Sequence, residues 1–255
     1  MNVLIEALRK KEKLAVMLAP SFPIVFEYPR IISQLKRLGF SYIVEVSAGA
    51  KKTNEQLLEL LKNNPDKRYI TSPCPTIVRM MRKQMPQYTK YFTTNVDSPM
   101  AATAKIVQEK YPGYRPVFVG PCIMKKMEAA EDIPDLNILV VTYEEIKQVF
   151  KEFNINDEFN PEDKFDIAGP GMVRTYPTDG GLAISSGATE KMSAEEVLIV
   201  SNWKNCIEAV KNFDVNPKIR LLDILFCNGG CISGPGIKSD LTVEQRKQKI
   251  LDYAK

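Results

Sequence analysis

Short apolar runs rich in branched residues alternate along the chain with longer stretches in which apolar residues recur every three or four positions. The short runs predict buried strands and the longer stretches predict amphipathic helices, an alternation typical of an α/β protein with parallel sheets. The predicted strands cover residues 14–18, 42–46, 68–71, 116–119, 136–141, 197–200 and 219–226. The predicted helices cover residues 28–38, 54–62, 76–84, 99–110 and 143–153, and residues 202–213 are also helical in pattern.

The pattern weakens between Asn154 and Gly187, where charged residues and Gly-Pro sequences predominate. This composition predicts a long loop that covers a cleft or links two lobes. Residues 241–255 predict an exposed basic helix. We therefore predict a single α/β domain over residues 1–255, with two lobes of mainly parallel β-sheet flanked by helices and a site in the cleft between them.

The composition is that of a globular protein, with 44% hydrophobic and 26% charged residues and no apolar run of membrane-spanning length. The complete absence of histidine excludes Ser-His and Cys-His catalysis and histidine metal ligands. No nucleic-acid motif occurs, so we expect no nucleic acid as a partner. The absence of a membrane-spanning run leads us to expect no membrane partner. The net charge of +4 is small, and basic groups such as Arg79, Arg82 and Lys83 indicate either solvated helix faces or a docking site for an acidic protein.

Four of the five cysteines lie in short loops rich in proline and glycine, namely Cys74, Cys122, Cys227 and Cys231. Three of these loops directly follow predicted strands, and ligands in open α/β sheets bind beyond the carboxyl ends of strands. We therefore expect the four thiols to converge on one cleft. Cys206 lies in the helical stretch 202–213 and is predicted to be a core residue.

Four convergent thiols can hold a 4Fe-4S cluster or a zinc ion, or they can be ordinary buried cysteines. Structural zinc sites usually come as paired short knuckles, whereas only Cys227 and Cys231 form a close pair here. An odd cysteine count without a signal peptide argues against disulfides and predicts a cytoplasmic location. The residues favour the iron-sulfur cluster and leave zinc as the main alternative.

Prolines next to two of the cysteines predict helix starts at those positions. Pro75 follows Cys74 at the start of the predicted helix 76–84, and Cys122 follows Pro121 at the start of a predicted helix over 123–130. A helix N-terminus lowers a thiol pKa and favours the metal-binding thiolate. Lys125 lies three residues after Cys122 on the same helix face, so its ammonium either reaches an anion beside the cluster or is a solvated surface group.

Three ordered segments, 71–75 (Thr-Ser-Pro-Cys-Pro), 121–128 (Pro-Cys-Ile-Met-Lys-Lys-Met-Glu) and 226–231 (Phe-Cys-Asn-Gly-Gly-Cys), carry a resemblance to a known family. In order and spacing they resemble the signature motifs of the FeFe-hydrogenase H-cluster domain. The resemblance covers residues 14 to 236 and includes all four loop cysteines.

The resemblance implies a 4Fe-4S cluster on Cys74, Cys122, Cys227 and Cys231, with the last thiolate bridging to a di-iron subcluster that carries CO, cyanide and an azadithiolate. It implies that Lys125 binds a cyanide, which makes Lys125 the candidate catalytic residue. It also implies further cofactor contacts from Ala19, Pro20 and Ser21 around a second cyanide, and from Ser98 and Met100 beside the di-iron unit.

The sequence departs from the family pattern where protons are delivered. Hydrogen-producing members carry a cysteine just before the first cluster ligand, and this chain has Pro73, which has no exchangeable proton. The methionine that precedes the second motif is replaced by Gly120. Loss of a positioned acid-base group costs on the order of 10² to 10⁴ in rate. We therefore expect slow or biased turnover.

The relay glutamates of the family also have no direct counterparts. Their aligned positions hold Leu57 and Leu60, and Glu55 and Glu59 are the nearest candidates to replace them.

The resemblance predicts a minimal, divergent FeFe-hydrogenase that interconverts H2 with protons and electrons, without an accessory ferredoxin domain. Its expected partners are ferredoxin or another electron-transfer protein and the hydrogenase maturation proteins. Two alternatives stay open: a domain that senses H2 or redox state with the same cofactor, and an iron-sulfur assembly scaffold that binds the 4Fe-4S cluster alone.

Overall fold

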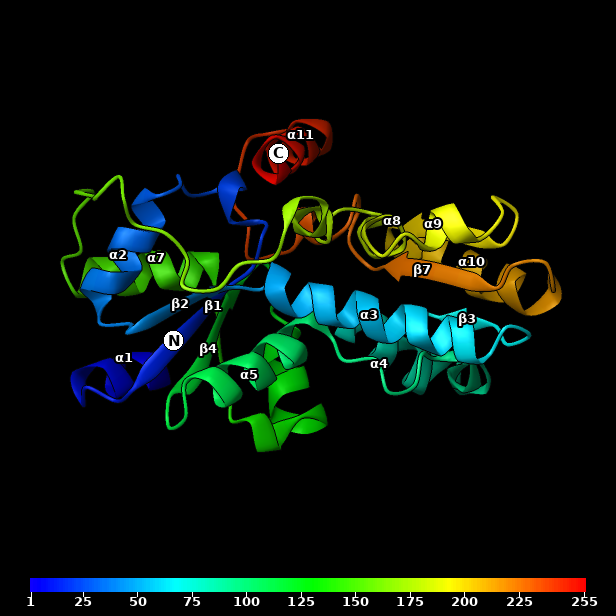
Figure 1. Ribbon diagram of the computed structural model, residues 1–255, viewed down its shortest axis with the longest axis horizontal. Coiled ribbons are helices and arrows are strands. Elements are labelled where there is room, and N and C mark those ends of the chain that lie inside the picture. Colours follow the sequence, from blue (N-terminus) through cyan, green and yellow to red (C-terminus); the bar gives the residue numbers. More distant parts are fainter.

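The computed structural model describes all residues 1–255 and forms two lobes side by side along the long axis of the molecule (Figure 1). The first lobe is built on a four-stranded parallel sheet in the order β2-β1-β4-β5. Its strands are β1 (Leu14–Leu18), β2 (Tyr42–Glu45), β4 (Arg115–Gly120) and β5 (Leu139–Thr142). Every residue of β1 is buried, as expected of a central parallel strand covered on both faces.

The second lobe contains a smaller parallel sheet in the order β3-β7-β6. Its strands are β3 (Tyr69–Ile70), β7 (Leu221–Leu225) and β6 (Val197–Ser201). The predicted α/β fold with two lobes of mainly parallel sheet is therefore confirmed.

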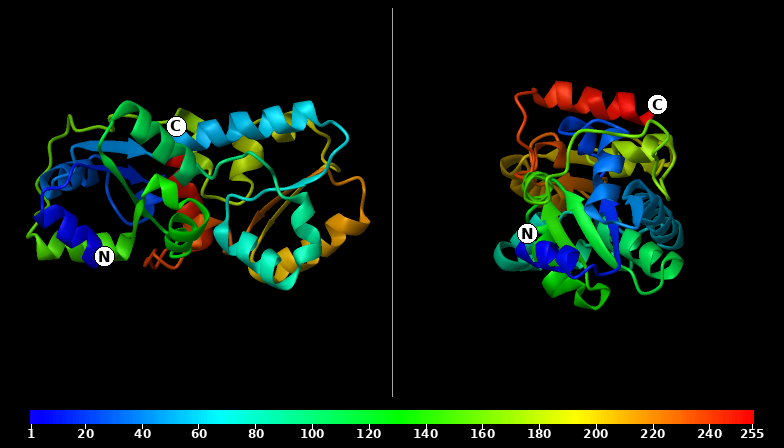
Figure 2. Two further views of the ribbon diagram at one scale, coloured as in Figure 1. Left: turned by 90° about the horizontal axis from the view of Figure 1, so that it is seen from below. Right: turned by 90° about the vertical axis from the view of Figure 1, so that its left-hand side faces the viewer.

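The helices flank the two sheets on both faces (Figures 1 and 2). Those of the first lobe are α1 (Asn2–Arg9), α2 (Arg30–Leu38), α5 (Pro99–Lys110) and α7 (Tyr143–Glu152), which share one large core with its sheet. In the second lobe, α4 (Pro75–Gln84) and α10 (Trp203–Val215) share a core on one face of the sheet. A further core joins α8 (Gly181–Ser185) and α9 (Ala188–Lys191) to the other face.

Two elements connect the lobes. Helix α3 (Ser47–Asn63) starts directly after β2 and packs its far end into the core of the second lobe through Leu57 and Leu61. It begins seven residues before the predicted start. Gly49, near this start, allows close packing on α5, because a Cβ at this position would lie 2.2 Å from Thr103 Oγ1. Helix α3 therefore spans the junction of the lobes (Figure 1).

The segment from residue 154 to 187 also crosses the junction, and it both links the lobes and covers the cleft. It pairs with β2 at Ile167, forms a short 3-10 turn at Gly171–Thr175, and continues into α8. The C-terminal helix α11 (Val243–Ala254) is less exposed than predicted, because Ile250 and Ala254 are buried.

Two further differences from the predicted elements have local causes. The helix predicted over 123–130 is broken into α6 (Lys125–Met127) and a π-helical turn at Glu128–Asp132. The predicted strand 136–141 begins only at Leu139, because Pro134–Leu136 form a 3-10 turn and Asn137 adopts a left-handed conformation. None of the helices combines the length and the apolar character needed to cross a bilayer.

Candidate metal centre between the lobes

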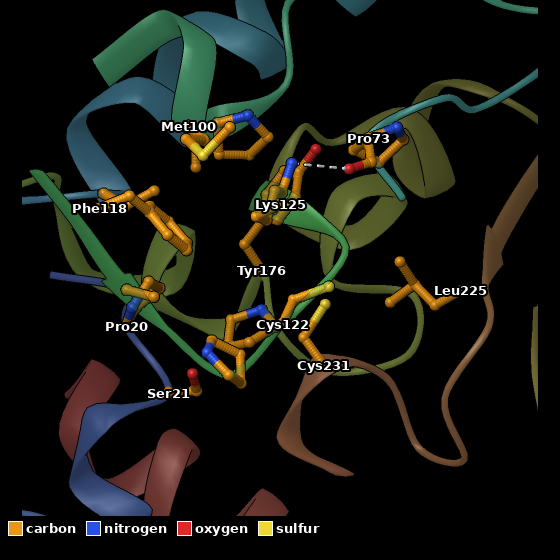
Figure 3. A pocket seen from close by; sticks show the side chains of 16 residues that line it. Pro20, Ser21, Pro73, Met100, Phe118, Cys122, Lys125, Tyr176, Leu225 and Cys231 are labelled. Atoms are coloured by element: carbon orange, nitrogen blue, oxygen red, sulfur yellow. Dashed lines mark hydrogen bonds between the residues drawn. The ribbon is translucent and has the colours of Figure 1, made fainter. Parts of the chain in front are cut away.

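The loops that follow β1, β4 and β7 surround a cavity of about 70 Å³ at the junction of the lobes (Figure 3). This volume is well above the roughly 10 to 15 Å³ that a single water requires. Its walls are mostly apolar, and its lining includes Ala19, Pro20, Ser21, Pro73, Met100, Phe118, Cys122, Lys125, Tyr176, Leu225 and Cys231. The cavity therefore combines a dry wall with a few groups able to bind a polar ligand.

The four predicted cysteine ligands converge on this junction from three loops. Cys74 follows β3 and is the N-cap of α4, Cys122 follows β4, and Cys227 and Cys231 follow β7. Their thiols are close enough to influence one another electrostatically, because Cys74, Cys122 and Cys227 all raise the pKa of Cys231. Cys122 and Cys231 line the cavity, whereas Cys74 and Cys227 lie outside its lining.

Burial dominates the acidity of Cys122, Cys227 and Cys231. It raises the pKa of Cys227 to about 12 and raises that of Cys231 well above its ordinary value. Burial also raises the pKa of Cys122, although Lys125 and the N–H groups of Met124 and Lys125 act in the opposite direction. The prediction of a lowered pKa was therefore wrong for Cys122, because desolvation outweighs the start of the short α6. A metal group that binds here must displace thiol protons.

The two candidate metal groups place different demands on the spacing of the thiols. A zinc ion holds four sulfurs at about 2.3 Å, which brings them within about 3.8 Å of one another. No group of three or more Cys, Asp or Glu side chains is placed so that it could hold a single metal ion. A 4Fe-4S cluster has a different requirement, because each of its thiolates binds a different iron.

Lys125 is held by a buried polar network rather than by solvent. Its ammonium donates to Glu128 Oε2 at 2.5 Å and to the carbonyl oxygen of Pro73 at 3.2 Å, and both charged residues are more than nine-tenths buried. Ser98 does not line the cavity: its hydroxyl donates to Glu128 and caps α5 at Ala101 N. The interpretation of Lys125 as a solvated surface group is therefore wrong.

Glu128 was not among the predicted site residues. The signal was present, because an acidic residue three positions after Lys125 lies on the same helical face. What the spacing did not reveal is that both side chains are buried and that Ser98 completes the network.

Ser21 lies in the cavity wall, and its hydroxyl proton is already used. Tyr143 Oη donates to the carbonyl oxygen of Ala19 at 2.9 Å, and Ser21 Oγ lies 2.7 Å from the same Tyr143 oxygen. Because a phenol has one proton, Ser21 is the donor in the second bond. Only the lone pairs of the Ser21 hydroxyl remain for a ligand in this arrangement.

Over residues 12–235 the chain matches the family described as "Iron only hydrogenase large subunit, C-terminal domain". The chain belongs to this family.

Relatives of this iron-only hydrogenase domain include two curated proteins. The chain is 23% identical over 274 residues to "Probable cytosolic Fe-S cluster assembly factor oxy-4" of Caenorhabditis elegans, covering 87% of this chain and 60% of that protein. It is 25% identical over 264 residues to "NADP-reducing hydrogenase subunit HndD" of Solidesulfovibrio fructosivorans, covering 81% of this chain and 45% of that protein. The chain thus spans about half the length of these relatives.

Solved structures show the same fold. A variant of FeFe-hydrogenase HydA1 from Chlamydomonas reinhardtii superimposes with a TM-score of 0.72 at 18% identity, over 97% of this chain and 88% of that one. The structure of HydA(deltaEFG), which concerns stepwise FeFe-hydrogenase H-cluster assembly, matches with the same score, identity and coverage. At this identity the likeness establishes the fold alone.

Two buried hydroxyls without hydrogen-bond partners bear on whether the residues of this iron-only hydrogenase domain fit a metal group. Tyr176 Oη and Ser233 Oγ are buried and have no hydrogen-bond partner within the protein. Tyr176 lines the cavity, and Ser233 follows Cys231 by two residues. Buried donors without partners are rare and costly, so their position beside the thiols fits a site built to hold a polar group.

Two departures from the family pattern have structural explanations. Gly120 has no side chain because a Cβ there would lie 2.5 Å from the ring of Phe118, which fills the cavity wall instead. Leu57 is fully buried in the second lobe, whereas Glu55 and Glu59 are exposed and Glu55 pairs with Lys52. Neither glutamate lines the cavity.

The basic groups on α4 are largely neutralised. Arg79 forms ion pairs with Glu131 and Asp132, and Arg82 forms one with Asp132. A docking face for an acidic partner at this position would therefore carry less positive charge than the sequence implied.

Proposed function

We propose that the chain is a divergent FeFe-hydrogenase built as one H-cluster domain of two lobes, which interconverts H2 with protons and electrons slowly or with a bias in direction. The observation that carries this proposal is the proximity of the four motif cysteines at the junction of the lobes, beside a cavity that Cys122, Cys231 and Lys125 line. Membership of the iron-only hydrogenase family supports it.

The donor set fits the proposed cofactor. Cys74, Cys122, Cys227 and Cys231 would hold a 4Fe-4S cluster, and Cys231 would share its thiolate with a di-iron subcluster beside the cavity wall. The bound cofactor would supply the redox chemistry and the open metal site at which H2 is made or split.

The residues of the chain would bind this group and keep water away from it. Ala19, Pro20 and Met100 supply an apolar wall, which strengthens electrostatic interactions inside the cavity by excluding water. Lys125 places a positive charge at the wall, and its bond to Glu128 fixes the position of that charge. Ser98 acts through Glu128 and is a positioning residue.

Slow turnover follows from Pro73. It lines the cavity at the position that carries a relay thiol in the family, and its only polar group there, the carbonyl oxygen, accepts from Lys125. A carbonyl cannot give or take a proton, so proton delivery would rely on a less direct route.

Infrared spectroscopy of protein matured with the hydrogenase assembly enzymes tests the proposal. CO and cyanide stretching bands, together with about six irons per chain, are expected of a complete H-cluster. Absence of these bands, with about four irons per chain, would contradict the proposal and support a protein that carries the cubane cluster alone.

An iron-sulfur assembly function is the second candidate. It is favoured by the likeness to the assembly factor of C. elegans and by the loss of a proton-carrying side chain at Pro73. Transfer of the cluster to an apo iron-sulfur protein, measured by the acceptor's absorbance, separates this function from hydrogen turnover.

A sensory role with the same cofactor is the remaining alternative, and it predicts bound H2 or a changed redox state without sustained turnover.

For the leading proposal we expect a ferredoxin or another electron-transfer protein as electron partner, maturation proteins as assembly partners, and a cytoplasmic location.

A further inference from the structure

The hydroxyl of Tyr176 is the feature of the cavity that the residues of the protein do not explain. Tyr176 is 9% exposed, lines the cavity together with Cys122, Cys231 and Lys125, and has no hydrogen-bond partner within the protein (Figure 3). It belongs to the segment between the lobes, just after the 3-10 turn at Gly171–Thr175.

Apart from the two thiols, the other hydrogen-bond donors of the wall, Ser21 and Lys125, are largely committed to protein partners. The Ser21 hydroxyl donates its proton to Tyr143, and two of the three N–H groups of Lys125 donate to Glu128 and the carbonyl of Pro73. Tyr176 is therefore the one hydroxyl of the lining whose proton remains available to a bound group. A neutral phenol is a good donor and, at neutral pH, a poor proton carrier.

We propose that Tyr176 Oη donates a hydrogen bond to a terminal anionic ligand of the cyanide type on the metal group bound beside Cys231, and so positions that group in the cavity. This inference rests on the proposed function. It assigns Tyr176 a binding role and leaves proton delivery to other groups. A cyanide-type ligand suits the site because the cavity wall is mostly apolar and Tyr176 Oη is a buried donor without a protein partner.

Tyr176→Phe tests the inference because it removes the oxygen and keeps the ring. In matured protein, one cyanide stretching band should shift relative to the unsubstituted protein, while the remaining bands stay close to their positions. Tyr91→Phe is the matched control: it removes a hydroxyl that bonds Asp214 at the surface, outside the cavity, and should shift no band.

The outcomes separate this inference from the function on which it rests. Identical spectra for Tyr176→Phe and the unsubstituted protein would overturn the inference and leave the hydrogenase proposal standing. If the unsubstituted protein shows no cyanide bands, the proposed function fails first, and the inference falls with it because its acceptor is missing.

Thermal unfolding gives a second measurement that does not depend on activity. In metal-free protein, Tyr176→Phe should leave the melting temperature unchanged or raise it, because a buried hydroxyl without a partner is removed. In loaded protein the same change should lower the melting temperature, because a bond to the bound group is lost. An equal change in both forms would show a purely structural role and overturn the inference.

Discussion

The two lobes contribute different parts of the junction site. The second lobe supplies three of the four proposed thiol ligands, from the loops after β3 and β7. The first lobe supplies one thiol, Cys122, and most of the cavity wall, including the loop after β1 and Lys125. Under the proposed function, the second lobe would mainly hold the metal group and the first lobe would mainly form the wall around it.

The lobes are held together by connectors whose own packing does not involve metal. Glu45, at the end of β2, is fully buried and accepts hydrogen bonds from Ser47, from Arg174 in the crossing segment and from Tyr253 in α11. This network ties β2, the crossing segment and α11 to one buried carboxylate.

Among the substitutions that test the different roles of the two lobes, Cys122→Ser is expected to have the largest effect. It removes the only proposed metal ligand of the first lobe. The variant should lose most of its bound iron, since a serine hydroxyl is a poor substitute for a thiolate. Iron analysis and visible absorbance measure the loss. Cys206→Ala is the control: its thiol is buried in the second core and donates to Leu225 O, so the variant should keep its iron. Full iron content in Cys122→Ser would mean that the second lobe suffices.

Lys125→Met tests the wall of the first lobe. It leaves the Glu128 carboxylate buried without its cation, and such a loss costs about 3 kcal/mol or more. Urea unfolding of metal-free protein measures this cost. Adding Glu128→Gln should recover a large part of it, because the uncompensated charge is then removed. A cost below about 1 kcal/mol would mean that solvent already screens the pair.

Pro73→Cys tests whether the second lobe lacks only a proton-carrying side chain. The new thiol would lie at the cavity near Lys125, and hydrogen evolution by matured protein should rise about tenfold or more. Pro73→Ala, which removes the ring without adding a thiol, should give no such rise. Unchanged evolution with intact infrared bands would indicate that another proton path already operates.

The smallest expected effect is on the pH dependence of stability and concerns Asp223. This residue is a buried carboxylate in β7 of the second lobe. Burial raises its pKa to about 6, from roughly 4 in an unfolded chain. The folded state therefore binds this proton more tightly than the unfolded chain does. The stability of the folded state consequently falls as the pH rises from about 4 to 6.

Asp223→Asn removes this titration and should keep the bond from Ala183 N–H, which the amide oxygen can still accept. Stability at pH 7.5 should rise by about 1 to 3 kcal/mol, with little change at pH 4. Urea unfolding at both pH values measures the difference. Destabilisation at pH 7.5 would show that the carboxylate charge itself supports the second lobe.

Much of the fold could be predicted from local pattern. The bounds of β1 and α5 agree with prediction, because a continuous apolar run and an N-terminal Ser-Pro pair are strong local signals. The short helices α8 and α9 were not predicted, because glycines interrupt their periodicity and tertiary packing stabilises them.

The site likewise contains residues that local sequence signals predict and residues that only tertiary packing reveals. The cysteines were found because thiols in Pro/Gly loops after strands are a local signal of convergence. Glu128 and Tyr176 were missed as members of the cavity region, because a glutamate and a tyrosine are ordinary surface or core residues until burial and missing partners mark them.

The sequence by itself determined the fold class, the family and the four thiols that meet at the junction, because these depend on residue type, spacing and strand order. Only the tertiary structure decided that Lys125 is paired with Glu128, that Ser21 has already given its proton to Tyr143, and that Tyr176 has not. The physical reason is that hydrogen bonding and desolvation depend on which groups from distant segments face one another across the two lobes.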